Sequence, residues 1–487
     1  MAHVLEHAKR VAAAFELSDE DVQRCAEAFI GELRLGLSEI TPSMCQIPTF
    51  VTQIAGGHEK GISLAVDLGG TNLRVCSVEL HGDTTSTVLQ SQLPVPPNIM
   101  ACDQAVRLFS FIANRIQDFL RTYHQSRLDA AAKDPNTPFL SLGFTFSFPA
   151  YQTALDAGIL LRWTKGFDIP DAVNQDVCML LQKELDVLKL PVKVAALVND
   201  AVGTVMSRAY SIPTSHVRPM VGAIFGTGTN GVYLQALSEV TKPIEGQSAL
   251  TGQSMFMSTE WGSFDNKLAV LPVTSYDAEL NQFSVNPGNQ MFEKRVSGMF
   301  LGELLRLAVL EIYRDSQVKL FGDFIADDLA LAKRWSVDSS IVSVAESDDS
   351  TALSVLSQKI YDTFGIPEDF VTPEDAQAVK VIAHGIGTRA ARLAGMAVGS
   401  VIKQGRLLDA KSADTNGNGG KGGRKVDVAV DGSVIEHYPG FEVHMRNTLR
   451  VLDGIGDAGE SNIIIGHTKD GSSVGAAIIA LLASRTT

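Results

Sequence analysis

The residues with the clearest chemical potential are two aspartates that stand beside apolar runs. Asp67 precedes the glycine pair Gly69-Gly70 in GISLAVDLGGTNLRV, and Asp200 follows the apolar run VKVAALV. Glycine turns let backbone N–H groups approach phosphate oxygens, and an aspartate beside such a turn can bind a cation. A carboxylate at the end of a buried strand lies where α/β folds place their chemistry, although Asp200 could also cap the helix that follows. The pattern therefore favours phosphate binding at the turn and a functional role for both carboxylates.

A second glycine turn lies in the stretch VGAIFGTGTNGVYLQAL. Its Gly228-Thr229-Asn230 repeats the Gly70-Thr71-Asn72 of the first turn, and apolar residues flank both copies. Each stretch is predicted to form a strand, a tight turn and a second strand. Two related hairpins predict two related lobes that would hold nucleotide phosphates between them.

Four other classes of enzyme are not supported: two match a short motif only in part, and two have no matching motif. Residues 226–231 satisfy the dinucleotide pattern G-x-G-x-x-G, but that pattern must open a helix, and Val232-Tyr233-Leu234 is predicted to be strand. The G-x-S-x-G match around Ser473 lacks the downstream histidine that a hydrolase triad requires, because no histidine follows His467. The sequence has neither a Walker A lysine motif nor H-E-x-x-H, so neither a P-loop enzyme nor a zincin is supported.

The composition bounds the class of protein. The 487 residues are 45% hydrophobic and 20% charged, which is typical of a globular protein with two to four domains or one bilobed body. A net charge of −14 argues against nucleic acid and anionic membranes as partners. Five scattered cysteines without a C-x-x-C pair, and an N-terminus without a continuous apolar region, predict a cytoplasmic protein with reduced thiols.

Several segments are predicted to surround the chemistry-bearing residues. Residues 18–37 have apolar side chains at helical spacing, with Ser18 as the N-cap. The three phenylalanines of LGFTFSFP (142–149) share one face of a strand and are predicted to be core. The apolar run 474–483 is too short to span a membrane and predicts a buried helix. The glycine-rich segment 411–425 predicts a solvated loop.

These residues and their spacing resemble the eukaryotic hexokinase family, most closely its fungal glucokinase branch. LGFTFSFP, followed by Leu155-Asp156, Leu160 and 163–167 (WTKGF), follows the family's sugar-site signature without a break. The resemblance runs from about Cys45 to the C-terminus and includes LAVDLGGTNLRV, VND, GTGTNG, TEWGSFDN, NPGNQMFEKRVSGMFLGELLR, DGSVIEHYPGF and DGSSVGAA. It implies ATP-dependent phosphorylation of the 6-hydroxyl of a hexose, glucose in the first place, with hexose 6-phosphate and ADP as products, which is the first step of glycolysis.

The resemblance also implies a set of sugar-binding residues. Asp200 would be the general base that takes the proton from the sugar 6-hydroxyl, and Lys165 would be a second catalytic residue. Such a ring of amide, hydroxyl and carboxylate groups can discriminate hexose epimers, because a wrong epimer leaves buried partners unpaired. The residues that would contact the hexose are Ser147, Thr164, Lys165, Asn199, Asp200, Asn230, Glu260 and Glu293.

ATP would be the co-substrate, and the resemblance implies that Mg²⁺ accompanies it. Asp67 would anchor the Mg²⁺, directly or through water. Arg74 could add a cation near the phosphates, although a solvated strand arginine is an alternative. Gly432-Ser433 and the segment 470–475 would form the adenosine side. The residues that would cradle the phosphates are Gly69, Gly70, Thr71, Asn72, Thr227 and Gly228.

The expected architecture is α/β, with the two-lobed actin-like, ribonuclease-H-like fold of hexokinases. Residues 1–57 are expected to form a helical segment of the large lobe and residues 58–199 the small lobe. Residues 200–469 would complete the large lobe, and residues 470–487 would return to the small lobe as a helix. Sugar binding is expected to close the cleft and exclude water.

Three residues depart from the family pattern, and they leave the preferred sugar open. Ser258 stands where the family usually has asparagine, Gln92 where many relatives carry a nucleotide-side lysine, and Ser473 where glycine is commoner. A kinase for another sugar, such as N-acetylglucosamine, is one alternative. A non-catalytic sugar sensor is another alternative. Loss of Asp67, Lys165 or Asp200 would favour a sensor, but all three residues are present. The protein is expected to be a monomer or weak dimer.

Overall fold

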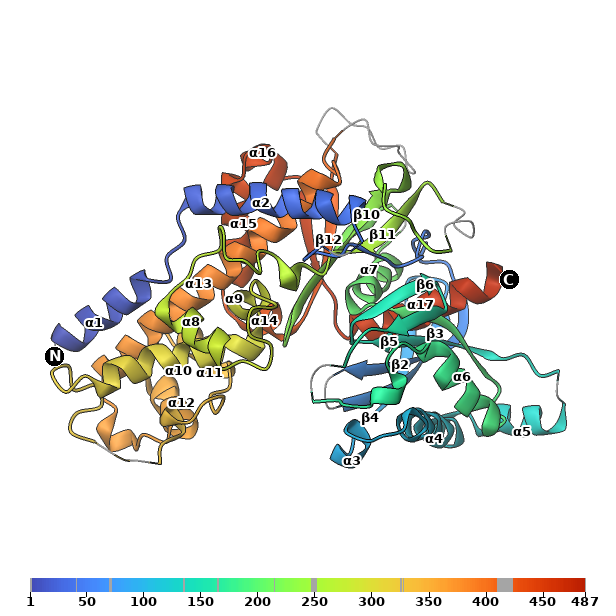
Figure 1. The fold of residues 1–487 in the computed structure, drawn as a ribbon, viewed down its shortest axis with the longest axis horizontal. Helices are drawn as coiled ribbons and strands as arrows, with labels where there is room; N and C mark the ends of the chain where they lie inside the picture. The colour runs from blue at the N-terminus through green and yellow to red at the C-terminus, as the bar shows by residue number, and fades with distance from the viewer. Residues whose placement is uncertain are drawn as a thin grey trace.

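Two lobes, each built on one β-sheet, lie side by side in the computed structural model (Figure 1). No helix in the described part of the chain is long and apolar enough to cross a bilayer. The structure describes residues 2–40, 42–69, 72–134, 136–163, 166–213, 215–246, 252–324, 326, 328–409 and 424–486.

The smaller lobe contains a five-stranded sheet in the order β4-β3-β2-β5-β8. Strands β2, β3 and β4 form an antiparallel meander, whereas β5 and β8 run parallel to β2. A separate hairpin pairs β6 with β7. The strands are β2 (Lys60–Gly69), β3 (Asn72–His81), β4 (Ser86–Pro94), β5 (Leu140–Phe146), β6 (Ala150–Ala154), β7 (Ala157–Leu160) and β8 (Val192–Val198).

Helices cover both faces of this sheet. On one face, the predicted core phenylalanines Phe144, Phe146 and Phe148 pack with apolar residues of α4 and α6, and all three are buried as predicted. On the other face, α17 lies against β2, β5 and β8. The lobe's helices, with that last helix, are α3 (Pro97–Met100), α4 (Ala105–Tyr123), α5 (Gln125–Lys133), α6 (Val177–Val187) and α17 (Gly471–Thr486). The buried helix predicted at 474–483 is therefore confirmed.

The larger lobe contains a six-stranded sheet in the order β1-β11-β10-β9-β12-β13. Strands β9 and β10 form the second predicted glycine hairpin, and β12 runs parallel to both β9 and β13. Because Thr229 begins strand β10, no helix follows the turn, and the dinucleotide pattern is excluded as predicted. The strands are β1 (Ile47–Pro48), β9 (Pro219–Phe225), β10 (Thr229–Ala236), β11 (Ser254–Ser258), β12 (Val426–Asp431) and β13 (Ile463–His467).

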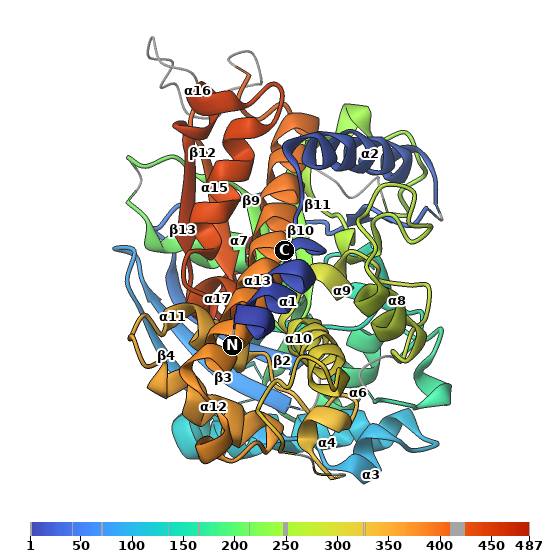
Figure 2. The ribbon, with the colours of Figure 1, turned by 90° about the vertical axis from the view of Figure 1, so that its left-hand side faces the viewer.

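A helical layer covers the outer face of the large sheet, with the long α13 at its centre (Figure 2). The predicted N-terminal helix is α2, whose N-cap Ser18 forms a capping box with Asp21. The helices of this layer are α1 (Ala2–Ala13), α2 (Asp19–Ser38), α8 (Ser275–Gln282), α9 (Glu293–Val296), α10 (Gly298–Arg314), α11 (Ser340–Ser347), α12 (Ser354–Phe364), α13 (Pro373–Gln404), α14 (Ser433–His437), α15 (Phe441–Val451) and α16 (Gly456–Glu460).

The two sheets face each other across a pair of crossing helices. Helix α7 (Asp200–Ser211) lies on the large sheet, α17 lies on the small sheet, and the two helices are in contact. The crossing depends on glycines, because a methyl group at Gly475 would overlap the carbonyl of Gly203. Helix α17 also packs closely on β5, where a methyl group at Gly143 would overlap the carbonyl of Ala476. Buried apolar residues from both sheets and both helices form one cluster, so the lobes share a core at this point.

The predicted loop at 411–425 falls almost entirely on residues 410–423, which lie outside the described residues. Only Arg424 and Lys425 of that segment are described, immediately before β12 begins at Val426.

Candidate active site

Four of the predicted residues meet at one edge of the small sheet. Asp67 pairs in register with Thr145 of β5, and Thr145 pairs with Val198 of β8, so the three parallel strands end together. A methyl group at Gly69 would lie 3.3 Å from Asp67 Oδ1 and 3.5 Å from Ser147 Oγ, which places these side chains beside the glycine turn. Asn199 and Asp200 follow β8 at the same edge. The carboxyl ends of parallel strands are where α/β proteins place ligands.

The start of α7 corrects one expectation from the sequence. The N-cap is Asn199, whose Oδ1 accepts a hydrogen bond from the Ala201 N–H at 3.0 Å, and Asp200 is the first helical residue. Asp200 Oδ1 accepts from the same N–H at 2.8 Å. Because the neighbouring amide serves as the cap, the Asp200 carboxylate is held at the positive end of the helix without being the cap itself.

The second glycine hairpin is tied to Glu293 at the start of α9. Glu293 Oε2 accepts a hydrogen bond from the Thr229 N–H at 2.9 Å, and a methyl group at Gly228 would lie 2.7 Å from the same oxygen. The hydroxyl of Thr229 accepts from the Trp261 indole N–H at 2.9 Å. The structure thus brings Gly228, which is predicted to bind phosphate, next to Glu293, which is predicted to bind sugar.

Asn230, Ser258 and Glu260 form a hydrogen-bond network on the large sheet. Asn230 Nδ2 donates to Ser258 Oγ at 3.0 Å and to Glu260 Oε1 at 2.8 Å, and Ser258 Oγ donates to Glu260 Oε1 at 3.2 Å. Asn230 Oδ1 accepts from the backbone N–H groups of Gly231 and Glu260, which fixes the orientation of the amide. Ser258 was noted in the sequence only as a departure from the family pattern.

Glu260 combines a strained backbone with a raised side-chain pKa. Its φ of 55° and ψ of 42° lie in the left-handed region, which is uncommon for a residue with a side chain and concentrates at functional sites. Burial raises the pKa of Glu260, and the negative charge of Asp200 raises it further, while hydrogen bonds from Ser258 and Asn230 oppose the rise. The charge of Asp200 acts on Glu260, so the two carboxylates, one at the start of α7 and one just after β11, lie near each other in the large lobe.

The turn 226–228 packs against the predicted adenosine side. A methyl group at Gly226 would lie 3.3 Å from the Cα of Gly432 and 3.5 Å from the backbone N of Ser433. Gly432 has φ 119°, a conformation that side chains rarely adopt, and a methyl group there would meet the backbone of Phe225. A small pocket of about 170 Å³ adjoins this contact, and its lining includes Gly432, Ile435 and His467.

Residues at the start of α17 contact the first hairpin. Arg74 Nη1 of β3 donates to Asp470 Oδ1 at 2.7 Å, and its Nη2 donates to Gln92 Oε1 at 3.3 Å. Ser472 Oγ donates to Asp67 Oδ2 at 3.4 Å. Arg74 is therefore ion-paired rather than a solvated strand arginine, and Gln92, the second departure from the family pattern, is one of its partners.

Asp431 is a carboxylate beside the predicted adenosine side that the sequence interpretation did not single out. Its Oδ1 accepts from the Gly432 N–H at 2.7 Å, and its Oδ2 accepts from the Gly471 N–H at 2.9 Å. Burial raises its pKa, the two backbone hydrogen bonds oppose the rise, and the charges of Asp470 and Asp200 add to it. The signal was available, because Asp431 ends the apolar run of β12 just as Asp200 follows that of β8.

Four predicted site residues lie outside the described residues. They are Gly70, Thr71, Thr164 and Lys165. Their neighbours are described: Gly69 pairs with Asn72 across the first turn, and Trp163 donates its indole N–H to the Ile169 carbonyl at 2.8 Å.

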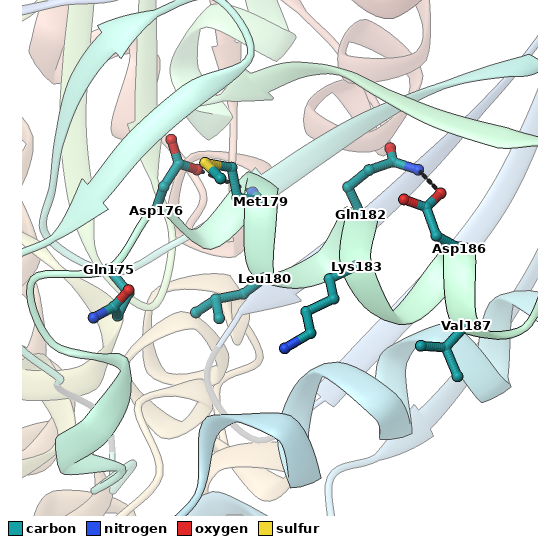
Figure 3. Close-up of a pocket in the computed structure, with 8 residues that line it drawn as sticks. All are labelled: Gln175, Asp176, Met179, Leu180, Gln182, Lys183, Asp186 and Val187. Carbon is teal, nitrogen blue, oxygen red and sulfur yellow. Dashed lines mark hydrogen bonds between the residues drawn. The ribbon is translucent and has the colours of Figure 1, made fainter.

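A surface groove on the small lobe is separate from this site. An open groove of about 720 Å³ follows helix α6, and all of its lining residues fall within 175–187 (Figure 3). Helix α6 covers the face of the small sheet opposite to α17, so none of the predicted site residues lines the groove.

Sequence comparison places the chain in a family. Two family models described as Hexokinase match residues 7–210 and 220–482, which together cover most of the chain. The chain belongs to the hexokinase family. It is 43% identical to a glucokinase of Aspergillus niger, over 99% of this chain and 98% of that protein. It is 36% identical to glucokinase-1 of Saccharomyces cerevisiae, over 99% of this chain and 97% of that protein.

Solved hexokinase structures share the fold of this hexokinase. The hexokinase of Schistosoma mansoni complexed with glucose matches with a TM-score of 0.79 at 31% identity, over 98% of this chain and 99% of that one. A second hexokinase crystal structure matches with a TM-score of 0.80 at 26% identity, over 99% of this chain and 100% of that one. The predicted two-lobed, actin-like hexokinase fold is confirmed. The protein is an ATP-dependent hexose kinase.

Proposed function

We propose that the protein transfers the γ-phosphoryl group of ATP to the 6-hydroxyl of glucose. The observation that carries this proposal is the convergence of Asp67, Ser147 and Asp200 at one edge of the small sheet. The preference for glucose is supported by the names of two relatives that align over nearly their full lengths, both glucokinases, and by the glucose complex of the Schistosoma mansoni hexokinase.

In this proposal Asp200 is the general base. Its carboxylate accepts the proton of the 6-hydroxyl as the hydroxyl oxygen attacks the γ-phosphorus, so the proton ends on Asp200. The bond between the γ-phosphorus and the oxygen that bridges to the β-phosphate breaks, and ADP is the leaving group. The hydrogen bond from the Ala201 N–H holds the carboxylate at the start of α7. Lys165, which lies outside the described residues, stays a prediction from the sequence as the second catalytic residue.

The donors at the sheet edge fit a magnesium ion that is bound together with substrate phosphates. Mg²⁺ prefers oxygen ligands and is usually held by one or two carboxylates plus phosphates rather than by an all-protein cage. Asp67 provides a carboxylate beside Gly69, and no group of three or more metal-ligating side chains occurs among the described residues. Asp67 would hold the ion, directly or through water, and the ion would neutralise charge on the phosphoryl group.

The remaining residues bind and orient the two substrates. Backbone N–H groups of the two glycine hairpins would cradle the phosphates. The turn 226–228 already lies against Gly432, which would place the phosphates next to the adenosine side. Asn199, Asn230, Glu260 and Glu293 would contact the sugar hydroxyls with Ser147 and Thr164. Ser433 and the segment 470–475 would flank the adenosine.

The test is a coupled ADP-release assay with Mg-ATP and glucose, fructose, mannose or N-acetylglucosamine. We expect the highest kcat/KM with glucose. Asp200→Asn should lower kcat by about 10²- to 10⁴-fold, because a general base contributes a factor of that size. Calorimetry should show that this variant still binds glucose, and Asp323→Asn, at an exposed surface carboxylate, should behave as wild type.

Two outcomes would replace the proposal. Turnover of N-acetylglucosamine alone would keep the mechanism and change the substrate. Hexose binding by the wild type without any ADP release would identify a sugar sensor.

A further inference from the structure

Asn230 and Glu260 differ in how many of their hydrogen-bonding groups are used within the protein. Both N–H bonds of the Asn230 amide are donated within the protein, one to Ser258 Oγ and one to Glu260 Oε1. Glu260 Oε1 therefore accepts from two side chains, Asn230 and Ser258. Glu260 Oε2 makes no hydrogen bond with any residue that the structure describes. The carboxylate thus has one oxygen fixed by the protein and one available to a ligand.

Ser258 stands at the centre of this arrangement. Its hydroxyl is the only group among the described residues that both accepts from Asn230 and donates to Glu260. The side chain is 2% exposed, at the last position of strand β11. There Ser258 pairs with Val232 of β10 and with Ile47 of β1. A residue held between two strands cannot follow a moving ligand, so the Ser258 hydroxyl keeps a fixed position.

The strained backbone of Glu260 requires contacts that hold it in place. Glu260 is two residues beyond β11 and has a left-handed backbone, a strained conformation that persists only where surrounding contacts enforce it. The Glu260 N–H donates to Asn230 Oδ1 at 3.1 Å, and Ser258 Oγ holds the side chain of Glu260. Backbone and side chain of Glu260 are therefore both fixed by the Asn230–Ser258 pair.

We propose that Ser258 is a positioning residue for hexose recognition, which orients the Glu260 carboxylate so that Oε2 reads the stereochemistry of one sugar hydroxyl. This inference rests on the proposed function, because it assigns Glu260 to the sugar. Ser258 need not touch the substrate. Ser258 restricts the movement of the Glu260 carboxylate, which could otherwise form a hydrogen bond with the hydroxyl of either epimer of the sugar.

The deciding variant is Ser258→Ala, with Ser254→Ala as the matched control. Ser254 is four residues earlier on β11, on the same face of the strand, and its hydroxyl makes no hydrogen bond with any described residue. We expect Ser258→Ala to raise the KM for glucose roughly tenfold, because one N–H of Asn230 is left unpaired and Glu260 loses a donor. The KM for ATP should change less than twofold, and Ser254→Ala should resemble wild type.

Two further readouts separate positioning from a loss of stability. The ratio of kcat/KM for glucose to that for mannose or galactose should fall severalfold in Ser258→Ala. Ser258→Thr keeps the hydroxyl and should restore most of the ratio, since threonine is well suited to a strand. A ratio in Ser258→Ala equal to that of wild type would overturn the inference, and so would a threonine variant as impaired as the alanine variant.

The pH profile gives an independent check. Glu260 is faced by Asp200 from α7, by Arg162 from the loop after β7, and by Cys45 ahead of β1. Only the ionised carboxylate accepts hydrogen bonds on both oxygens, so glucose binding weakens as the pH falls through the pKa of Glu260. The hydrogen bond from Ser258 lowers the pKa of Glu260. Without it the pKa rises, so Ser258→Ala should move the acid limb of kcat/KM for glucose to higher pH. An unmoved limb would contradict the role.

Failure of the proposed function can be distinguished from failure of this inference. If the wild type phosphorylates no hexose, the proposed function fails. The role of Ser258 is then decided by calorimetric titration of glucose into wild type and into the Ser258→Ala and Ser254→Ala variants. Roughly tenfold weaker binding in Ser258→Ala alone supports the role, and equal binding in all three proteins overturns it.

Discussion

Carboxylates in the cleft differ in how many of their acceptor positions the protein itself occupies. Asp431 is the extreme case, because both of its oxygens accept backbone N–H bonds, from Gly432 at 2.7 Å and from Gly471 at 2.9 Å. Gly432 immediately precedes α14 and Gly471 begins α17, and we assign both helix starts to the adenosine side. Asp431 therefore holds two nucleotide-side loops in register, and we expect it to act on ATP binding without contacting the sugar.

Asp431→Asn should raise the KM for ATP about tenfold or more. The substituted amide has one oxygen and would turn an N–H₂ group toward one of the two backbone N–H groups, and hydrogen bonds to charged partners contribute about 1.5–3 kcal/mol. The KM for glucose should change less than twofold. Steady-state kinetics with each substrate varied in turn measure both values.

Asp328→Asn is the control for this change, because Asp328 is a 90% exposed carboxylate of the large lobe. Equal effects of Asp431→Asn on the two KM values would show that Asp431 stabilises the whole cleft rather than the nucleotide loops.

Helices α7 and α17 cross so closely that their glycines cannot be replaced at low cost. Gly203 contacts Ser472 and Gly475 across the crossing, and the space for a methyl group at Gly475 is already filled by the Gly203 carbonyl. Two helices that approach at glycines bring their backbones together, and any added atom must push them apart.

Gly475→Ala should lower the stability of the protein by about 1–3 kcal/mol, which is the usual effect of overpacking. The midpoint of urea unfolding, followed by circular dichroism, measures the change. Gly31→Ala is the matched control, because Gly31 is also inside a helix but has open space around its Cα. Alanine there should be neutral or stabilising by up to about 1 kcal/mol. Similar midpoints for Gly475→Ala and wild type would mean that the crossing is not tightly packed.

A second contact between elements should make stability depend on pH. His384 of α13 contacts Glu346 of α11 at 3.0 Å, and Tyr438, just after α14, donates its hydroxyl to the same carboxylate. The hydrogen bond to Glu346 raises the pKa of His384 above its ordinary value of about 6.5, against the opposing effect of burial. The stabilisation is therefore complete below pH 6.5 and is lost as the pH rises through the raised pKa.

His384→Gln should accordingly lower the melting temperature more at pH 6 than at pH 8. The imidazole is about half exposed, so we expect a difference of no more than about 2 °C. Differential scanning fluorimetry of both proteins at the two pH values provides the comparison. A melting temperature difference that is the same at pH 6 and pH 8 would contradict the assignment of this stabilisation to the ionised pair.

At the scale of the whole molecule, the layers run helix, sheet, helix pair, sheet, helix. We propose the lobe boundaries at 57/58, 199/200 and 469/470, since β2 begins at Lys60, α7 at Asp200 and α17 at Gly471. By these boundaries the eight candidate sugar residues divide equally: Asp200, Asn230, Glu260 and Glu293 fall in the large lobe, and Ser147, Thr164, Lys165 and Asn199 fall in the small one. A hexose that contacts both sets should therefore draw the lobes together.

Small-angle scattering should show this movement as a decrease in the radius of gyration when glucose is added. The value should move toward the roughly 23 Å expected for one compact body of 487 residues. L-Glucose, which has the same composition and mirror-image hydroxyls, should leave the scattering curve unchanged. An equal response to both sugars would indicate a solvent effect instead of closure.

The sequence was sufficient for features that depend on local patterning. Alternating and continuous apolar runs predicted β5 and β8, the glycine turns predicted both hairpins, and the capping box predicted the start of α2. Contacts between distant segments could not be predicted in this way. Arg74 meets Asp470 across 396 positions of the chain, and nothing in the sequence around either residue indicates the partner.

Helix α17 also has a consequence for how the protein is made. Strand β8 ends at Val198, but the helix that covers the adjacent face of its sheet begins only at Gly471. At about 5–20 residues per second on a ribosome, the nascent small lobe would wait roughly 14–55 s with that apolar face uncovered. Chaperones that bind apolar surface therefore have a defined interval in which to act during synthesis, and messenger RNA features that slow translation between these two elements would lengthen it.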